Sequence, residues 1–189
     1  MRALPIFLFA ALMGTGTAQA QQLDSASQKL EMLGDAPVGC VANSARATSQ
    51  VNATFQSNGP SGGVVVFPAL VDQTTATARA SSIALALPVV CNTSHRVTLR
   101  SSNGGLLREG ANPGRNATGG FSEFQAYDVS VEWQGQSASI GGASASASLA
   151  QGQPAKGDMR IDIAVPQGTR PLVAGTYTDS VVVEIRPAN

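Results

Sequence analysis

The chain has 189 residues, of which 43% are hydrophobic and 13% are charged, and its 12 basic and 12 acidic side chains give a formal net charge of zero. A nucleic-acid partner would require a basic patch, and this balanced composition argues against one. Lysine occurs only at Lys29 and Lys156, whereas Ala, Ser, Gly, Thr and Val are abundant. Such a composition favours an all-β exported protein over a helical one.

The first 20 residues have the plan of a secretory signal peptide. Met1 and Arg2 give a positive start, residues 3–13 are apolar, and small residues precede an expected cleavage between Ala20 and Gln21. A membrane anchor is the less favoured alternative, because a spanning helix needs about 20 apolar residues. We therefore expect an exported mature protein that begins near Gln21 and does not span a membrane.

Two cysteines, Cys40 and Cys91, and one histidine, His95, are present. An even cysteine count in an exported protein favours a disulfide, which would stabilise the fold by roughly 4 kcal/mol in the chain-entropy model. Free thiols or a metal pair are the alternatives. Two cysteines and one histidine do not complete a four-ligand zinc site without carboxylates, so a Cys40–Cys91 disulfide and no metal site are predicted.

Residues 21–36 form an N-terminal extension whose structure the pattern leaves open. Small and apolar residues occupy alternate positions of this extension, as in a strand, and the alternation continues to Val38 just beyond it. These residues are Ala26, Leu30, Met32, Gly34, Ala36 and Val38. Leu30, Met32 and Leu33 would also suit a short helix, so periodicity does not decide between the two.

From residue 37 to the end, short alternating or β-branched stretches are separated by turn signals. We expect strands over 37–43, 49–56, 81–91 and 93–101, a β-branched stretch over 63–71 that is broken by Pro68, and another strand after the Asn103-Gly-Gly turn. Residues 109–120 read as a long loop. Loops of that length in a compact domain are often functional or mobile.

The second half of the chain contains two clear strands. Residues 121–133 place Tyr127, Val129, Val131 and Trp133 on one face, which favours core packing over an exposed sugar-stacking platform. Residues 159–165 alternate cleanly. The Ser/Ala/Gly-rich stretch 134–157 between them is expected to be loop-like, with at most a weak strand over 143–149.

The clearest strand of all is residues 175–186, where Tyr177, Val181, Val183 and Ile185 share one face. Its apolar face needs a covering sheet. With about eight strands and no helix-length amphipathic run, the predicted architecture is a single β-sandwich over 37–189 with Greek-key connections.

No catalytic, cofactor-binding or metal site is expected. His95 lies in a strand beside Arg96 without a nucleophile elbow, so a structural histidine is the favoured interpretation. Asp158 and Asp162 share a strand face, but this spacing alone is a weak sign of a glycosidase pair. GxGxxG, P-loop, HExxH and EF-hand patterns are all missing from the sequence.

Four stretches together resemble the bacterial spore coat protein U domain family. They are Cys91-Asn-Thr-Ser followed by Val97-Thr-Leu, then Asn103-Gly-Gly-Leu106, Tyr127-Asp-Val-Ser-Val-Glu-Trp133, and Ala174-Gly-Thr-Tyr-Thr-Asp-Ser-Val-Val-Val-Glu-Ile185. The resemblance covers roughly Cys40 to the C-terminus. Its most specific part is the Gly-Thr-Tyr-Thr-Asp-Ser run that begins at Gly175.

This resemblance implies an incomplete immunoglobulin-like sandwich that lacks its last strand. A periplasmic chaperone would cover the gap, an outer-membrane usher would export the subunit, and a neighbouring subunit's N-terminal strand would then fill the gap. That implies a structural subunit of an adhesive surface pilus (fimbrium) or secreted coat, passing through the periplasm to the cell surface. By the same resemblance, the candidate donor strand consists of Leu30, Met32, Gly34, Ala36 and Val38.

The alternative hypothesis is a free-standing exported binding module, for example for glycans. In that case the residues from Gln21 to Gly39 would close the open edge of their own domain. The pairing of this segment therefore discriminates the two hypotheses. An enzyme is the least favoured interpretation.

Overall fold

In a computed structural model, the described residues are 29–112, 118–141 and 145–188, and they form an all-β protein. The predicted signal peptide and its cleavage site lie outside these ranges, as do residues 21–28. Across the described ranges, no helix has both the length and the apolar character needed to cross a bilayer.

The described strands and two short 3-10 helices follow one another along the chain: β1 (Cys40–Ala42), β2 (Arg46–Val51), β3 (Thr54–Ser57), η1 (Gly59–Ser61), β4 (Gly63–Val66), β5 (Ser81–Cys91), β6 (His95–Ser101), β7 (Gly105–Arg108), η2 (Thr118–Gly120), β8 (Phe124–Ala126), β9 (Asp128–Trp133), β10 (Gln136–Ile140), β11 (Ser146–Gln151), β12 (Ala155–Val165), β13 (Tyr177–Thr178) and β14 (Val181–Pro187). Most of their pairings are between strands that are not consecutive in sequence, the exceptions being β3-β4, β7-β8 and β9-β10.

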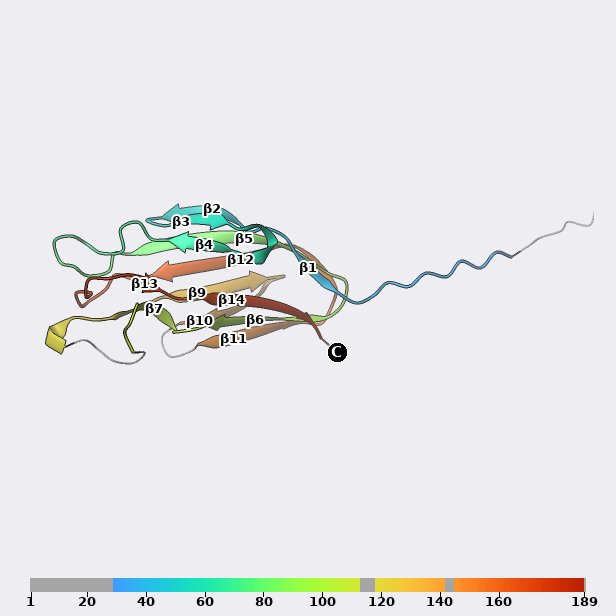
Figure 1. Cartoon of the computed structure of the whole chain (residues 1–189). Coiled ribbons are helices and arrows are strands. Elements are labelled where there is room, and N and C mark those ends of the chain that lie inside the picture. The colour runs from blue at the N-terminus through green and yellow to red at the C-terminus, as the bar shows by residue number, and fades with distance from the viewer. Residues whose placement is uncertain (1–28, 113–117, 142–144, 189) are drawn as a thin grey trace, which may run out of the picture. The chain divides into compact units, whose positions relative to one another are not determined.

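The larger sheet has the order β1-β5-β12-β9-β10, and β2 also pairs with β5 (Figure 1). All of these pairings are antiparallel. β5 and β12 are its longest strands, with 11 residues each, and they pair along their full length. Apolar residues alternate along β12 and point to one face, as expected for a strand with one face in the core.

Three smaller sheets complete the structure. Strand β6 lies between β11 and β14, β7 lies between β13 and β8, and β3 and β4 form a two-stranded hairpin. The β11-β6-β14 sheet packs against the larger sheet, as in a β-sandwich. β6 and β14 are neighbours in one sheet but far apart in sequence, and the chain between them passes through the larger sheet. Connections between the layers are therefore long. The Greek-key order of these connections stays a prediction.

The core lies between the two layers. Its largest fully buried side chains come from both sheets: Trp133, Ile83, Leu99, Met159, His95, Val89, Val97, Val129, Val131, Val165 and Cys91. Burial of each large apolar side chain contributes about 1.5–3 kcal/mol. The predicted core face of residues 127–133 is confirmed, because Tyr127, Val129, Val131 and Trp133 are all buried. Neither aromatic ring is available as a sugar-stacking platform.

The disulfide prediction is confirmed. Cys40 and Cys91 are bonded, and they face each other as register partners of β1 and β5. The bond therefore joins two neighbouring strands at their shared end.

Several predicted boundaries were wrong. Residues 121–133 form two strands, because β8 pairs with β7 whereas β9 pairs with β10 and β12, and the chain changes sheets at Tyr127. The 134–157 stretch is not loop-like. It contains β10, β11 and the start of β12. These strands were not clearly recognised because their alternate positions carry Ser and Ala, which differ too little in hydropathy to show which face is buried.

Other predicted strands are shorter or interrupted: the 37–43 strand is reduced to β1, and the 49–56 strand is divided between β2 and β3. The 63–71 strand ends at Val66, before Pro68, which lacks the N–H that a ladder requires. The C-terminal strand is divided between β13 and β14, with Asp179 and Ser180 between them. These two strands pair with β7 and β6, respectively.

Candidate functional site

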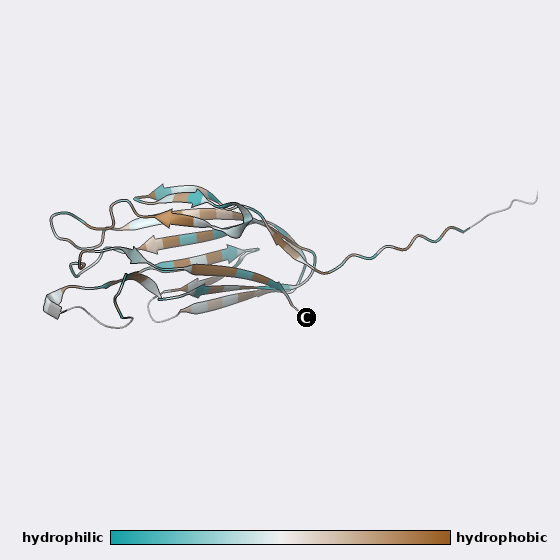
Figure 2. Cartoon of the chain, in the orientation of Figure 1, coloured by the Kyte–Doolittle hydropathy of each residue, from teal (hydrophilic) through white to brown (hydrophobic). Residues whose placement is uncertain are grey.

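An apolar groove runs beside strand β14. Within the described parts of the chain, β14 pairs with β6 along one edge and with nothing along the other. Its alternate residues Val181, Val183 and Ile185 are half-buried and contact the core. Figure 2 shows that β14 is hydrophobic over most of its length. An unpaired strand edge presents free N–H and C=O groups in a regular row.

The β3-β4 hairpin supplies the opposite wall of the groove. Phe55, Val65 and Phe67 line it from this side and pack partly against the core. In the described ranges, β4 pairs with β3 alone, so this wall also has an unpaired edge. The groove thus separates two short sheets that do not hydrogen-bond to each other.

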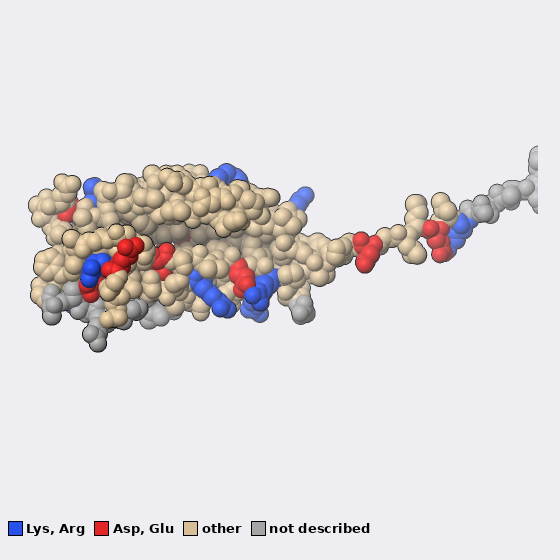
Figure 3. Space-filling view, viewed as in Figure 1, with Lys and Arg blue, Asp and Glu red and all other residues tan. Residues whose placement is uncertain are grey.

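Side chains of the larger sheet form the floor. Leu85 and Leu87 of β5 and Ile161 and Ile163 of β12 line it. The cavity has a volume of about 630 Å³. Figure 3 shows it as a long hollow across one face of the molecule, lined mostly by uncharged residues. An open apolar groove of this size is unusual on a monomeric protein unless something covers it.

One end of the groove is polar and is built around Asp179. Its Oδ2 accepts hydrogen bonds from the hydroxyls of Tyr127 and Ser101, the latter at 2.5 Å. Its Oδ1 accepts from the backbone N–H groups of Asn103 at 3.0 Å and Ser180 at 2.7 Å. Burial, followed by the hydrogen bond to Asp179, raises the pKa of the Tyr127 hydroxyl. The carboxylate thereby fixes the start of β14 against the turn that follows β6.

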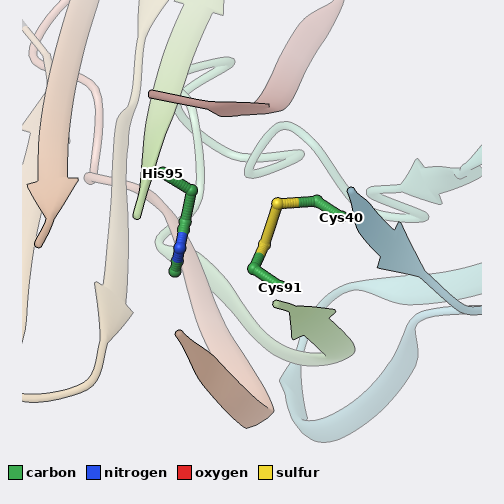
Figure 4. Close-up of side chains that lie close together, drawn as sticks. All are labelled: Cys40, Cys91 and His95. Atoms are coloured by element: carbon green, nitrogen blue, oxygen red, sulfur yellow. A yellow bond between two sulfur atoms is a disulfide. The ribbon is translucent and has the colours of Figure 1, made fainter. Parts of the chain in front are cut away.

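The Cys40–Cys91 disulfide closes the other end. Cys40 and Ala42 of β1 line the groove there, close to Ile185 of β14. Figure 4 shows the His95 imidazole beside the disulfide. The two ends of the groove are therefore held by different means, one by a hydrogen-bonded carboxylate and one by a covalent bond.

His95 is fully buried, and its two ring nitrogens are both engaged. Nδ1 donates to the Thr93 carbonyl at 2.9 Å, and Nε2 accepts from the Trp133 indole N–H at 2.8 Å. Because a carbonyl only accepts, this arrangement assigns the proton to Nδ1. The structural role predicted for His95 is confirmed.

Cys40, Cys91 and His95 are the one group of three or more possible metal ligands in the described ranges, with ligand atoms within 4.8 Å of one another. Both sulfurs belong to the disulfide, which removes the thiolates that a metal would require. Asp158 and Asp162 do not form a carboxylate pair. Each is instead engaged with an arginine, Asp158 with Arg46 and Asp162 with Arg160.

The candidate donor residues lie in a segment without secondary structure. Residues 29–39 contain no strand or helix, and the side chains of Leu30, Met32 and Leu33 are 82%, 87% and 97% exposed. Val38 and Ala36 are also exposed. A Cβ atom added at Gly34 would meet nothing within 4 Å, so the conformation found here does not require a glycine. We call residues 29–38 the N-terminal segment.

The sequence identified the β14 wall of the groove and the disulfide at its end, but it missed the opposite wall. Phe55 falls within the predicted strand over 49–56, and the sequence does not indicate which strand pairs with it or that residues 58–63 lie beside the C-terminal strand. The Asp179 interactions were also missed. The signal for them was the position of Asp179, an acidic residue that breaks the apolar parity of residues 175–186.

Searches with this chain against protein-family models, curated proteins and solved structures find no match. The geometry of the groove and the chemistry of the N-terminal segment are therefore the basis for a functional assignment.

Proposed function

We propose that the protein is a structural subunit of an exported surface pilus or coat, and that its copies join by donor-strand exchange. In this proposal the N-terminal segment of one copy lies in the groove of the next and pairs with the free edge of β14. The observation that carries the proposal is the apolar groove beside an unpaired C-terminal strand.

The chemistry of the groove suits an extended peptide. Strand addition combines backbone hydrogen bonds to an edge with pockets for alternate side chains. The unpaired edge of β14 offers the backbone hydrogen bonds, and the apolar lining of the groove offers the pockets for side chains. A compact small molecule would use the lining but leave the backbone edge unpaired.

The N-terminal segment suits the groove in pattern and length. Leu30, Met32, Gly34, Ala36 and Val38 share one strand face, and the large residues among them are exposed. Ten extended residues span about 33 Å, which exceeds the roughly 23 Å of the seven-residue β14. The segment is therefore long enough to cover the groove.

Before assembly, an uncovered groove with a free strand edge is an aggregation hazard. We include in the proposal a periplasmic chaperone that covers the groove and an outer-membrane usher that receives the subunit. The resemblance to the spore coat protein U family supports both partners. The disulfide supports passage through an oxidising compartment.

Two matched pairs of substitutions test the proposal. Met32→Lys places a charge on the face that would enter the groove, and Leu33→Lys places it on the opposite face. Similarly, Val183→Arg fills the groove, whereas Val90→Arg changes an exposed valine of β5 that does not line it. Polymer length is measured by light scattering after size-exclusion chromatography of the mature, oxidised protein.

Met32→Lys and Val183→Arg are expected to give monomers, and each control is expected to polymerise like the wild type. A mixture of the two monomeric variants should form dimers and no longer species, because Val183→Arg still has an intact donor segment and Met32→Lys still has an intact groove. Equal loss of polymers in test and control variants would refute donor-strand exchange.

A further inference from the structure

Asn92 holds the chain at the point where the N-terminal segment joins the sandwich. Its side-chain Oδ1 accepts a hydrogen bond from the Gly39 N–H at 2.8 Å, and its Nδ2 donates to the Pro37 carbonyl at 2.7 Å. Its backbone N–H donates to the Gly39 carbonyl at 3.1 Å. Asn92, the residue that follows β5, thus makes three hydrogen bonds to residues 37–39.

These bonds extend the β1-β5 pairing past the disulfide. Cys40 and Cys91 are register partners, so Gly39 and Asn92 form the next antiparallel pair. In an ordinary pair the Gly39 N–H would bond to the backbone carbonyl of Asn92. Here the side-chain amide takes that place and also reaches the Pro37 carbonyl. Residues 37–39 therefore continue the line of β1.

The same three residues are the ones that would have to turn if the segment folded back. The commonest tight connection that reverses a strand is a two-residue turn. Gly39 is the residue with the freedom to turn, but both its N–H and its C=O are bonded to Asn92. Pro37 has a fixed φ and restricts Ala36 to extended conformations. The hydrogen bonds to Asn92 therefore keep residues 37–39 extended, where a reversal of the chain would need a turn.

Direction also opposes closure within one chain. Strand β14 contacts β1. Its chain runs toward the disulfide end of the sandwich, because the Ala188 N–H donates to the carbonyl of Ser94, three residues after Cys91. A segment that turned back before Cys40 would therefore run parallel to β14. Parallel pairs are slightly less stable per residue than antiparallel ones. A segment from another copy can approach in either direction.

We propose that Asn92 is a positioning residue that keeps a chain from filling its own groove, so that the groove receives the N-terminal segment of a second copy. This inference rests on the proposed function. Asn92 bonds to Pro37 and Gly39, at the end of the N-terminal segment, and not to the donor residues Leu30 and Met32. It acts through the path of residues 37–39.

Two variants of the full chain weaken this restraint in different ways. Asn92→Ala removes both side-chain bonds and keeps the backbone bond, whereas Asn92→Asp keeps the acceptor for Gly39 and loses the donor for Pro37. A third variant inserts Gly-Ser-Gly-Ser between Ala36 and Pro37. It provides a turn ahead of an intact Asn92, so it tests the idea even where a substitution at Asn92 impairs folding.

The readouts are the fraction of monomer by light scattering and the binding of a fluorescent peptide with the sequence of residues 29–38 to that monomer. A monomer whose own N-terminal segment fills its groove does not bind the peptide, whereas a monomer with an empty groove binds it. Asn92→Ala should raise the ratio of closed monomer to polymer about tenfold, as expected for the loss of two hydrogen bonds. Asn92→Asp should have a smaller effect, and the insertion should produce closed monomer with Asn92 unchanged.

Polymers of normal length from both Asn92→Ala and the insertion variant would overturn the role of Asn92 and leave the proposed function in place. A wild-type protein that neither polymerises nor binds the peptide would instead overturn the proposed function itself. Monomer that still binds the peptide in both variants would show loss of assembly without self-closure, and would also contradict the inference.

Discussion

The hydroxyl of Tyr127 donates a hydrogen bond to the carboxylate of Asp179, which is 52 residues away in sequence. Tyr127 lies between two strands that belong to different sheets, and Asp179 lies between β13 and β14. The contact therefore connects the larger sheet to the start of the strand that forms the groove wall.

Asp179→Ala should destabilise the protein by about 3 kcal/mol, because it leaves two hydroxyls and two backbone N–H groups without their acceptor. Asp179→Asn keeps an acceptor for the backbone groups and should cost about half as much. Urea denaturation followed by circular dichroism measures both. Asp35→Ala, an exposed carboxylate of the N-terminal segment, is the control. A loss below about 0.5 kcal/mol for Asp179→Ala would contradict this account.

The stability of the protein should fall at alkaline pH. Burial raises the pKa values of both Tyr127 and Tyr177 above the ordinary tyrosine value of about 10. Above that pH the unfolded chain loses these protons first, so the free energy of unfolding decreases, by at most about 1.4 kcal/mol per pH unit for each tyrosine. Below pH 10 the contribution is fully present. Denaturation curves between pH 8 and about 11.5 should show a shallower decline for Tyr127→Phe. An unchanged slope would show that Tyr127 does not titrate differently in the two states.

Loss of the disulfide should reduce stability by roughly 4 kcal/mol, the chain-entropy value for a bridge with a sequence separation of 51. It should also loosen the end of the groove, where Cys40 contributes to the lining. Thermal unfolding of Cys40→Ala/Cys91→Ala, compared with the oxidised wild type, measures the loss. The double variant avoids a free thiol. A decrease of under 1 kcal/mol would mean that β1 is held mainly by its backbone pairing.

The Trp133–His95 hydrogen bond should appear as an energetic coupling. Trp133→Phe leaves His95 Nε2 without its donor, and His95→Ala leaves the buried indole N–H without its acceptor. Each should cost about 2–4 kcal/mol through cavity formation and the unpaired polar group. In a double-mutant cycle the combined variant should cost about 1 kcal/mol less than the sum. Strict additivity would show that the bond contributes nothing beyond packing.

The sequence predicted those parts of the fold in which hydropathy alternates strongly. β5, β6, β9, β12 and β14 all carry Val, Ile or Leu at alternate positions, and all were identified. β10 was not, and β11 was predicted only as a weak strand over 143–149, because Ser and Ala hardly distinguish a buried face from an exposed one. Their positions are set by pairing with β9 and β6, which a local pattern does not contain.

The candidate site was predictable only in part for a related reason. The apolar face of β14 can be read from a local stretch of sequence, and the pairing of Cys40 with Cys91 follows from the presence of two cysteines alone. The groove also requires Phe55 and Val65, more than 100 positions earlier in the sequence, to stand opposite Val183. The Asn92 contacts depend on the register that the disulfide sets between β1 and β5. Neither arrangement can be read from periodicity.

The central claim is that the groove beside β14 receives the N-terminal segment of another copy. Light scattering after size-exclusion chromatography, applied to the mature protein and to a chain lacking residues 21–35, tests it most directly. The account predicts polymers of the full-length protein that vanish on truncation, with the truncated chain still folded because every described strand lies from Cys40 onward. A stable full-length monomer that loses stability on truncation would mean that the segment completes its own domain, and would contradict the account.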